Sequence, residues 1–303
     1  MDAFLPKFFK TLFKDNPLPR GVNKWDEPLD GRVPVVLIHG TWLNAYNTWD
    51  YIAHYLLEEG HAVFAVNYGK EPDTFTGKAP GVYANNYLRT SQKEVAAFID
   101  EVLERTGAEQ VDLIGHSQGV AQARLYLTDS GGHNPDEPNR NKVRKLIGIG
   151  PATRGTTLSG ISTFAKKLDP TERSNSRVHS IFGGAALDQR KGAGFGEHLN
   201  RGGDTVPGVD YTMITARYDG IATPWKDQRM VAGEGATVHN YSVQEGGNIL
   251  DLSGHLAMLY SPRTLDLVLE ALKPSQRRLR KAVVLPMMGP VGLPGFMRRR
   301  HRR

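Results

Sequence analysis

The sequence predicts an α/β fold in which helices cover both faces of a mostly parallel central sheet. Short apolar runs alternate with helical patterns along the chain, and no internal repeat period appears. The 303 residues are enough to bury one full hydrophobic core. We therefore expect one main domain over 33–272, an amphipathic segment with a linker over 1–32, and a basic tail over 273–303.

Six short apolar runs predict the strands of this sheet. They lie at about Pro34–His39, His61–Asn67, Val111–Gly115, Val143–Ile149, Tyr211–Ala216 and Val238–Val243. Between or after them, apolar residues recur at helical spacing. The helices predicted from this spacing lie at about Trp49–Glu59, Thr90–Thr106, Ser117–Thr128 and Pro262–Leu272.

Two longer connections interrupt this alternation. Residues 151–209 are rich in Gly, Ser, Thr and Arg, and an excursion of this length between two strands is typical of a lid or cap. The loop 69–89, which is punctuated by proline and glycine, is predicted to form a second wall of a cleft.

The N-terminal segment has a strongly amphipathic pattern. If 3–14 were helical, its apolar residues would occupy about half of the wheel and three lysines the opposite side. Two interpretations remain open, a surface that binds lipid and a helix that docks on the core of the domain. No stretch of the chain approaches the length that a transmembrane helix needs, and no secretory signal is recognisable, so we expect neither.

Charge is distributed unevenly along the chain. The formal net charge is +6, but ten Arg and Lys residues and no acidic residue lie from Lys273 onward, which leaves the rest at about −4. The tail is compatible with a solvated end, an anionic membrane or nucleic acid, and nucleic acid is disfavoured because no nucleic-acid-binding motif is present. We expect peripheral contact with anionic membrane through the N-terminal segment and the tail. The sequence indicates no oligomeric state.

Ser117 is the candidate nucleophile. It is the central residue of GHSQG at 115–119, which follows an apolar strand and opens a helical pattern. This arrangement is typical of the nucleophile elbow, in which a serine occupies a strained turn and glycines let the strand and helix approach closely. The helix N-terminus beneath the serine presents free N–H groups to a developing anion.

A serine nucleophile needs a base, and the base needs an orienting acid; with this elbow both follow the serine in sequence. Among the later histidines, His255 is the candidate base because it follows the last strand and a glycine turn. Asp219 is the candidate acid because it lies just beyond the strand that ends near Ala216, and strand ends line the ligand crevice of open α/β sheets. The alternatives for the acid are Asp204, Asp210, Asp227 and Asp251.

The oxyanion that forms on the substrate needs N–H donors. In this type of site one comes from the residue after the nucleophile, here Gln118, and another from the loop after an earlier strand. Thr41 follows His39 and Gly40 in that loop, where its backbone N–H and its hydroxyl are placed to donate.

With these residues in hand, the chain resembles the bacterial class 2 lipases and esterases of the α/β-hydrolase superfamily, in particular the actinobacterial triacylglycerol lipases. The resemblance covers about Val33–Leu272 and rests on segments in the family's order, which are VPVVLIHGTWLNAYNTW, FAVNYG, VDLIGHSQG, LIGIGPATRGTTLSG, LNRGGDTVPGVDYTMITARYDGIATPW and NILDLSGHLAM. It implies an α/β-hydrolase fold with a lid-like excursion after the sixth strand region. It also implies the triad Ser117, Asp219 and His255, with oxyanion donors on Thr41 and Gln118.

The chain departs from this family in two features that bear on its location. Family members are commonly exported and often carry cysteines in the excursion, whereas this chain has no recognisable signal and no cysteine. We therefore expect a cytoplasmic or peripheral membrane location, and secretion is implied only by the resemblance.

The predicted reaction is hydrolysis of carboxylic esters through an acyl-enzyme, with lipid acyl esters as the expected substrate. The expected apolar walls of the acyl pocket are Trp42, Leu43, Tyr46, Trp225 and the excursion near Ile161 and Phe164. No cofactor or metal is expected, since no HExxH motif occurs and GAGFG lacks the context of a dinucleotide site. Two alternatives are an acyltransferase with the same triad and a noncatalytic lipid-binding module.

Overall fold

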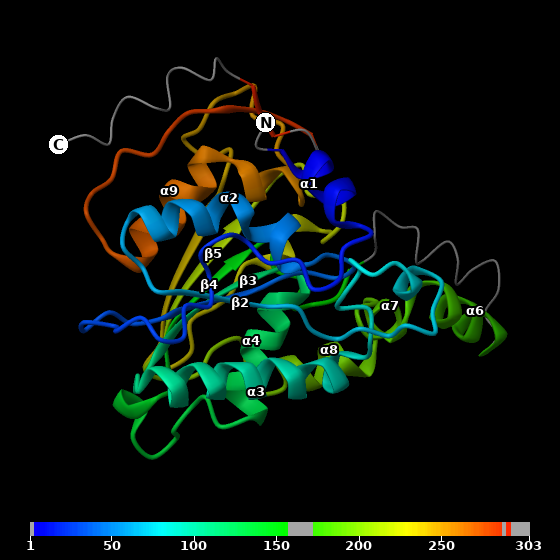
Figure 1. The fold of residues 1–303 in the computed structure, drawn as a ribbon, viewed down its shortest axis with the longest axis horizontal. Coiled ribbons are helices and arrows are strands. Elements are labelled where there is room, and N and C mark those ends of the chain that lie inside the picture. Colours follow the sequence, from blue (N-terminus) through cyan, green and yellow to red (C-terminus); the bar gives the residue numbers. More distant parts are fainter. Residues whose placement is uncertain (1–2, 157–171, 287–288, 292–303) are drawn as a thin grey trace.

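The centre of the molecule is a six-stranded parallel sheet with the order β2-β1-β3-β4-β5-β6 (Figure 1). The structure is a computed structural model that describes residues 3–156, 172–286 and 289–291. The prediction of an α/β fold with a parallel sheet is confirmed. The strands are β1 (Val35–Ile38), β2 (Val63–Val66), β3 (Val111–His116), β4 (Val143–Ile149), β5 (Asp210–Thr215) and β6 (Thr237–Ser242).

Strand β1 shows why these strands appear in the sequence as unbroken apolar runs. Its side chains alternate between two hydrophobic cores, with Val35 and Leu37 in one core and Val36 and Ile38 in the other. All four are fully buried. A strand covered on both faces has no polar side to alternate with.

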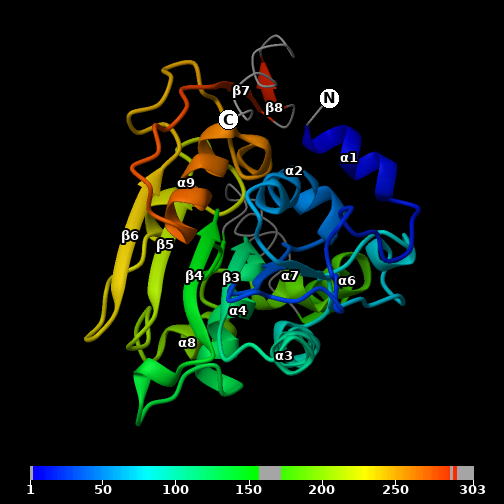
Figure 2. The same ribbon diagram turned by 60° about the vertical axis from the view of Figure 1, so that its left-hand side comes forward.

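Helices cover both faces of the sheet, as Figure 2 shows. Helices α1, α2 and α9 contribute to the core on one face, and α3 and α4 to the core on the other. The longer helices are α1 (Phe4–Thr11), α2 (Ala45–Glu58), α3 (Leu88–Thr106), α4 (Gln118–Asp129), α6 (Glu172–Phe182) and α9 (Pro262–Leu272). The short ones are α7 (Gly184–Asp188), α8 (Gly194–Asn200), η1 (Thr76–Lys78), η2 (Pro138–Arg140), η3 (Trp225–Gln228) and η4 (Ala257–Tyr260).

Helix α2 begins four residues before its predicted start because of its cap. The side chain of Asn44 accepts from the backbone N–H of Asn47, and the side chain of Asn47 accepts from the N–H of Asn44. This reciprocal capping box satisfies N–H groups that the first helical turn leaves free. The predicted helix at Trp49 is thereby extended back to Ala45.

Helix α1 docks on the domain, as one of the two interpretations of its pattern predicted. Phe4 is buried, and Leu5 and Phe8 pack against the same core as α2 and α9. Phe9 of α1 and Phe13, just beyond the end of the helix, remain 64% and 79% exposed. Its amphipathic face is therefore divided between the core and the surface.

The excursion 151–209 lies between β4 and β5 of the described sheet. Its described part forms α6, α7 and α8, whereas Ile161 and Phe164 lie outside the described residues. The loop 69–89 holds α6 and α7 by backbone bonds, which are Phe75 N–H to the carbonyl of Ser180 (2.9 Å) and Ala185 N–H to the carbonyl of Asn85 (3.1 Å). The loop thus supports the excursion.

The described part of the predicted basic tail packs against the domain. A two-stranded antiparallel sheet forms from β7 (Val283–Leu285) and β8 (Gly289–Val291), and Arg280 binds Asp266 of α9 through its guanidinium. The last arginines, from Arg298 onward, lie outside the described residues. Within the described ranges, no helix is long and apolar enough to cross a membrane.

Candidate active site

The predicted catalytic and oxyanion residues come together at the carboxyl edge of the sheet. Thr41 follows β1, Ser117 follows β3, Asp219 follows β5, and His255 lies beyond β6. Parallel strands end at a common edge, and ligands of open α/β sheets bind there. Residues up to 214 positions apart in the chain therefore share one site.

Ser117 occupies a strained turn between β3 and α4. Its φ of 54° and ψ of −119° lie in a region that costs a non-glycine residue about 1–3 kcal/mol, and its N–H donates to the carbonyl of Ile149 (3.0 Å). A Cβ on Gly119 would lie 2.1 Å from the Ile38 carbonyl oxygen, and one on Gly115 would lie 2.7 Å from the Gly119 carbonyl carbon. Both glycines of GHSQG are therefore required by close backbone packing.

Asp219 and His255 form a buried pair. Nδ1 of His255 lies 2.7 Å from Oδ2 of Asp219, and Oδ1 accepts from the N–H groups of Ile221 (2.9 Å) and Ala222 (2.8 Å). Burial by itself raises the pKa of Asp219, but the charge and hydrogen bond of His255 and the two N–H groups together lower that pKa below its ordinary value. Asp219 therefore remains a carboxylate that holds the imidazole by Nδ1.

The competing aspartates have other partners. Asp204 pairs with Arg154 (2.5 Å), and Asp227 with Lys191 (3.1 Å). Asp251 accepts from the N–H of Ser253 (2.9 Å), while Asp210 is exposed at the amino end of β5. Among the predicted acids, Asp219 is the one in contact with His255.

His116, between Gly115 and Ser117, fixes the backbone that carries His255. Its Nε2 lies 3.0 Å from the carbonyl oxygen of His255, and the two ring centroids are 4.7 Å apart. Burial, followed by repulsion from the His255 charge, lowers the pKa of His116 well below its ordinary value. His116 is therefore a neutral support beside the base.

The loop after β1 presents its backbone to the site through an unusual turn. The N–H of Leu43 donates to the carbonyl of Gly40 (3.3 Å), and Trp42, at the third position of the turn, has a φ of +58°. A positive φ is a strained conformation for so bulky a residue. Within the described residues, no carbonyl outside α4 accepts from the N–H of Thr41 or of Gln118, and Gln118 opens α4, where the first N–H groups have no partner inside the helix. Both groups are free to donate to a substrate oxygen.

The hydroxyl of Thr41 accepts two hydrogen bonds. One comes from Nε2 of Gln118 (3.1 Å) and the other from Nε2 of Gln189 (2.8 Å), the residue after α7 in the excursion. With both lone pairs occupied, the hydroxyl hydrogen has to point elsewhere. Sequence reasoning missed Gln189 because an amide in a glycine-rich excursion belongs to no motif and no periodic pattern.

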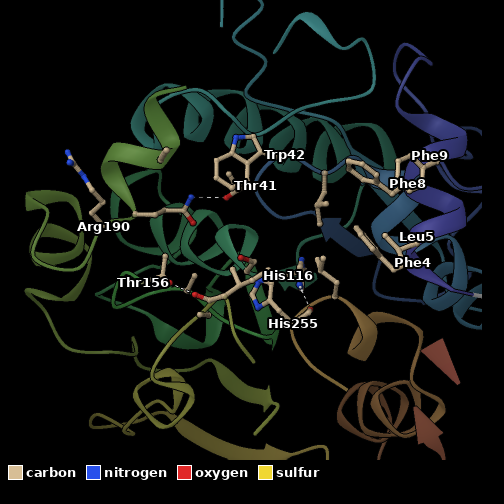
Figure 3. A pocket seen from close by; sticks show the side chains of 18 residues that line it. Phe4, Leu5, Phe8, Phe9, Thr41, Trp42, His116, Thr156, Arg190 and His255 are labelled. Carbon is tan, nitrogen blue, oxygen red and sulfur yellow. Dashed lines mark hydrogen bonds between the residues drawn. The ribbon is translucent and has the colours of Figure 1, made fainter. Parts of the chain in front are cut away.

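A cavity of about 310 Å³ lies over Ser117 and His255, in the volume range of small-molecule sites. Figure 3 shows its walls, which come from α1, the loop after β1 and the excursion. The lining is mostly apolar. Its described members are Phe4, Leu5, Phe8, Phe9, Thr41, Trp42, Leu43, His116, Ser117, Ala152, Thr156, Ala186, Gln189, Arg190, Ile221, Ala222, His255 and Leu256.

Two of the four predicted substrate-binding residues line this cavity, Trp42 and Leu43, and two do not. The Tyr46 hydroxyl accepts from Nζ of Lys10 (2.8 Å), so this side chain faces α1 from outside the cavity. Trp225 lies in η3 with the guanidinium of Arg229 over its ring. The four side chains of α1 were missed as cavity walls, although their apolar pattern was visible in the sequence.

Among the described residues, no group of three or more His, Asp or Glu side chains is arranged to hold a metal ion. The functional groups of the cavity are a serine hydroxyl, a buried histidine-carboxylate pair and free N–H donors. These are the parts that nucleophilic acyl transfer requires.

One family model matches most of the chain, and similar proteins include lipases. The sequence matches the family described as lipase (class 2) over residues 32–250. Triacylglycerol lipases from Pseudarthrobacter phenanthrenivorans and Burkholderia plantarii are each 26% identical over 152 residues, which are 48% of this chain and 41% and 37% of theirs. This chain therefore spans less than half the length of these curated relatives.

Among solved structures, the crystal structure of Aspergillus fumigatus lipase B has the same fold. It is 19% identical with a TM-score of 0.59, and the match covers 90% of this chain and 61% of that chain. The family match at 32–250 contains Ser117 and Asp219, but it begins after α1 and ends before His255.

Proposed function

Because this chain belongs to the class 2 lipase family, we propose that it hydrolyses carboxylic esters of lipids, as a triacylglycerol lipase or carboxylesterase does, through an acyl-enzyme on Ser117. The observation that carries the proposal is the buried contact of 2.7 Å between Asp219 and His255 beside a cavity that Ser117 also lines. A histidine oriented by a carboxylate is the base that a serine nucleophile needs.

In the first half of the reaction, Ser117 becomes acylated. Its Oγ attacks the carbonyl carbon of the ester while His255 removes the hydroxyl proton through Nε2. The carbonyl oxygen becomes an oxyanion, which accepts from the free N–H groups of Thr41 and Gln118. The tetrahedral intermediate then expels the alcohol, and His255 returns the proton to the oxygen that leaves.

In the second half, water releases the acid. His255 removes a proton from a water molecule, which attacks the acyl carbon, and the proton then returns to Oγ of Ser117 as the acyl group leaves. Asp219 remains ionised throughout, holds the imidazole in the tautomer with hydrogen on Nδ1, and stabilises the imidazolium. The lowered pKa of Asp219 favours this role.

The cavity favours lipid esters over small polar ones. Most of its described lining is apolar, including aromatic side chains from α1 and from the loop after β1. A site of this composition removes hydrocarbon from water, which stabilises a bound chain by about 0.8 kcal/mol per buried methylene.

The decisive experiment compares Ser117→Ala with wild type on nitrophenyl butyrate. We expect kcat to fall by at least about 10³-fold, because the variant has no attacking oxygen. Ser180→Ala is the matched control, since Ser180 is an exposed serine of α6 that bonds its own helix. Equal rates for Ser117→Ala and wild type would remove the proposed mechanism.

We propose, in addition, that the exposed side of the N-terminal segment contacts anionic membrane. Phe13 is 79% exposed, and Lys14 beside it is also exposed; an apolar side chain next to a cation suits an anionic lipid surface. We expect Phe13→Ala with Lys14→Ala to reduce sedimentation with phosphatidylglycerol vesicles. Equal sedimentation of wild type with neutral and anionic vesicles would contradict the electrostatic part.

A further inference from the structure

Helix α1 forms part of the active-site cavity although it lies outside the matched family region. Phe4, Leu5, Phe8 and Phe9 of α1 line the same cavity as Ser117 and His255, whereas the family match begins at residue 32. Figure 3 shows these four side chains together on one side of His255. The cavity of this chain is therefore completed by a segment that the family match does not include.

Several contacts hold α1 in this position. Lys7 forms an ion pair with Asp50 of α2, and the buried hydroxyl of Thr11 accepts from Nδ2 of Asn44 at 3.1 Å. Beyond the helix, the N–H of Gly81 donates to the carbonyl of Leu12 (2.9 Å). Because Asn44 caps the helix that follows the Thr41 loop, α1 is fixed relative to the oxyanion donors.

The two sides of the cavity differ in chemistry. The α1 side is lined by hydrocarbon and aromatic rings alone, whereas the lining from the excursion includes the polar side chains of Thr156 and Gln189. An ester also has two limbs, a hydrocarbon acyl chain and an oxygen-linked alcohol. The acyl chain has no polar group that needs a hydrogen-bond partner, so it can lie against α1 without a desolvation cost. The oxygen-linked alcohol would be buried there without partners, which is unfavourable.

We propose that α1 is the acyl-chain subsite of this active site, and that Phe8 and Phe9 contact the fatty-acyl chain of the ester attacked by Ser117. This inference rests on the proposed function. Phe4 is 3% exposed and Phe9 is 64% exposed, so the subsite runs from the buried interior to the mouth of the cavity. The contribution of Phe9 grows with chain length, because a short acyl chain ends before it reaches the mouth.

The test uses two matched variants, Phe9→Ala and Phe13→Ala. Both residues are exposed phenylalanines of the N-terminal segment, but only Phe9 is among the residues that line the cavity. The readout is the ratio of kcat/KM for nitrophenyl decanoate to that for nitrophenyl butyrate, with both esters monomeric and no vesicles present. Contact with a membrane does not affect this ratio.

We expect Phe9→Ala to lower this ratio about tenfold, which corresponds to about 1.4 kcal/mol, and Phe13→Ala to keep the wild-type ratio. Phe8→Trp supplies a second measurement, since a larger ring narrows the subsite and also lowers the ratio. If Phe8→Trp fails to fold, the result for Phe9→Ala alone tests the subsite. That variant should fold, because the Phe9 side chain is exposed and contributes little to the core.

The outcomes separate this inference from the proposed function. Wild type that hydrolyses butyrate, together with a Phe9→Ala ratio equal to that of wild type, would overturn the subsite alone. An equal drop in the ratio for Phe9→Ala and Phe13→Ala would also overturn it, since Phe13 does not line the cavity. If wild type hydrolyses no ester, the proposed function fails and the subsite fails with it.

Discussion

Replacing Asp219 by asparagine tests the proposed mechanism at one atom. In the structure Oδ1 of Asp219 accepts from two backbone N–H groups, so an asparagine must place its oxygen there. Its NH₂ group then takes the position of Oδ2 and faces Nδ1 of His255, 2.7 Å away in the native pair. Two donors cannot share that distance, so the imidazole shifts to the tautomer with hydrogen on Nε2.

That tautomer has no lone pair with which to remove the proton from Ser117. In serine hydrolases with a triad, the same change lowers kcat by about 10⁴-fold, or about 5 kcal/mol in the barrier. We expect a loss of that order in kcat for nitrophenyl butyrate at pH 7. Folding should be retained, because asparagine has nearly the shape of aspartate and keeps the two N–H bonds.

The matched controls are Asp227→Asn and Asp251→Asn, which alter two of the alternative acids. Asp227 pairs with Lys191 on the surface, and Asp251 bonds Ser253. Each control should retain kcat within a few-fold. The assignment of the acid would be refuted if kcat fell less than about tenfold in Asp219→Asn. It would also be refuted if kcat fell further in either control than in Asp219→Asn.

Three further predictions concern the supports of the site. Burial lowers the pKa of His39 to about 4, against about 6.5 in the unfolded chain. The unfolded chain therefore binds the extra proton, and the free energy of unfolding falls by up to about 3 kcal/mol between pH 6.5 and pH 4. Urea titrations should show a smaller fall for His39→Gln than for wild type, and an equal fall would exclude His39 as a cause. Gln189→Leu removes a hydrogen-bond donor to the Thr41 hydroxyl and should lower kcat about threefold to tenfold, with little change in unfolding temperature. A kcat equal to that of wild type would show that the bond from Gln189 does not orient the Thr41 hydroxyl. Gly119→Ala should destabilise the protein by at least about 2 kcal/mol, because the new Cβ would lie 2.1 Å from the Ile38 carbonyl oxygen. Gly194→Ala should not destabilise it, because a Cβ there meets no described atom within 4 Å. Similar urea midpoints for the two variants would contradict the packing argument.

The sheet and the edge that carries the site were predictable because they depend on local patterns. Strands buried on both faces, such as β1 and β3, appear as apolar runs. The residues after such strands share one edge, so Thr41, Ser117 and Asp219 could be placed from order alone. The strained turn at Ser117 is likewise encoded by its two glycines.

The walls of the cavity depend on direction and on tertiary contact, which spacing does not supply. Tyr46 and Trp42 lie four residues apart, yet Trp42 lines the cavity and Tyr46 faces Lys10. The periodic pattern of α1 fits both a lipid-facing helix and a docked helix. Only packing against α2 and η4 shows that Phe8 lines the cavity. The small sheet formed by β7 and β8 was also missed, since its strands are only three residues long.

The buried hydroxyl of Thr11 has a consequence for how substrates reach the site. It accepts from Nδ2 of both Asn44 (3.1 Å) and Asn47 (3.5 Å), the two residues of the capping box. Detaching α1 would leave these buried amides without that partner while the first turn of α2 lost its support, so both segments should open as one cooperative unit and exchange their amide hydrogens together. Swinging α1 aside is then a costly way to admit a substrate, and entry past the rim at Phe9 is the less expensive route.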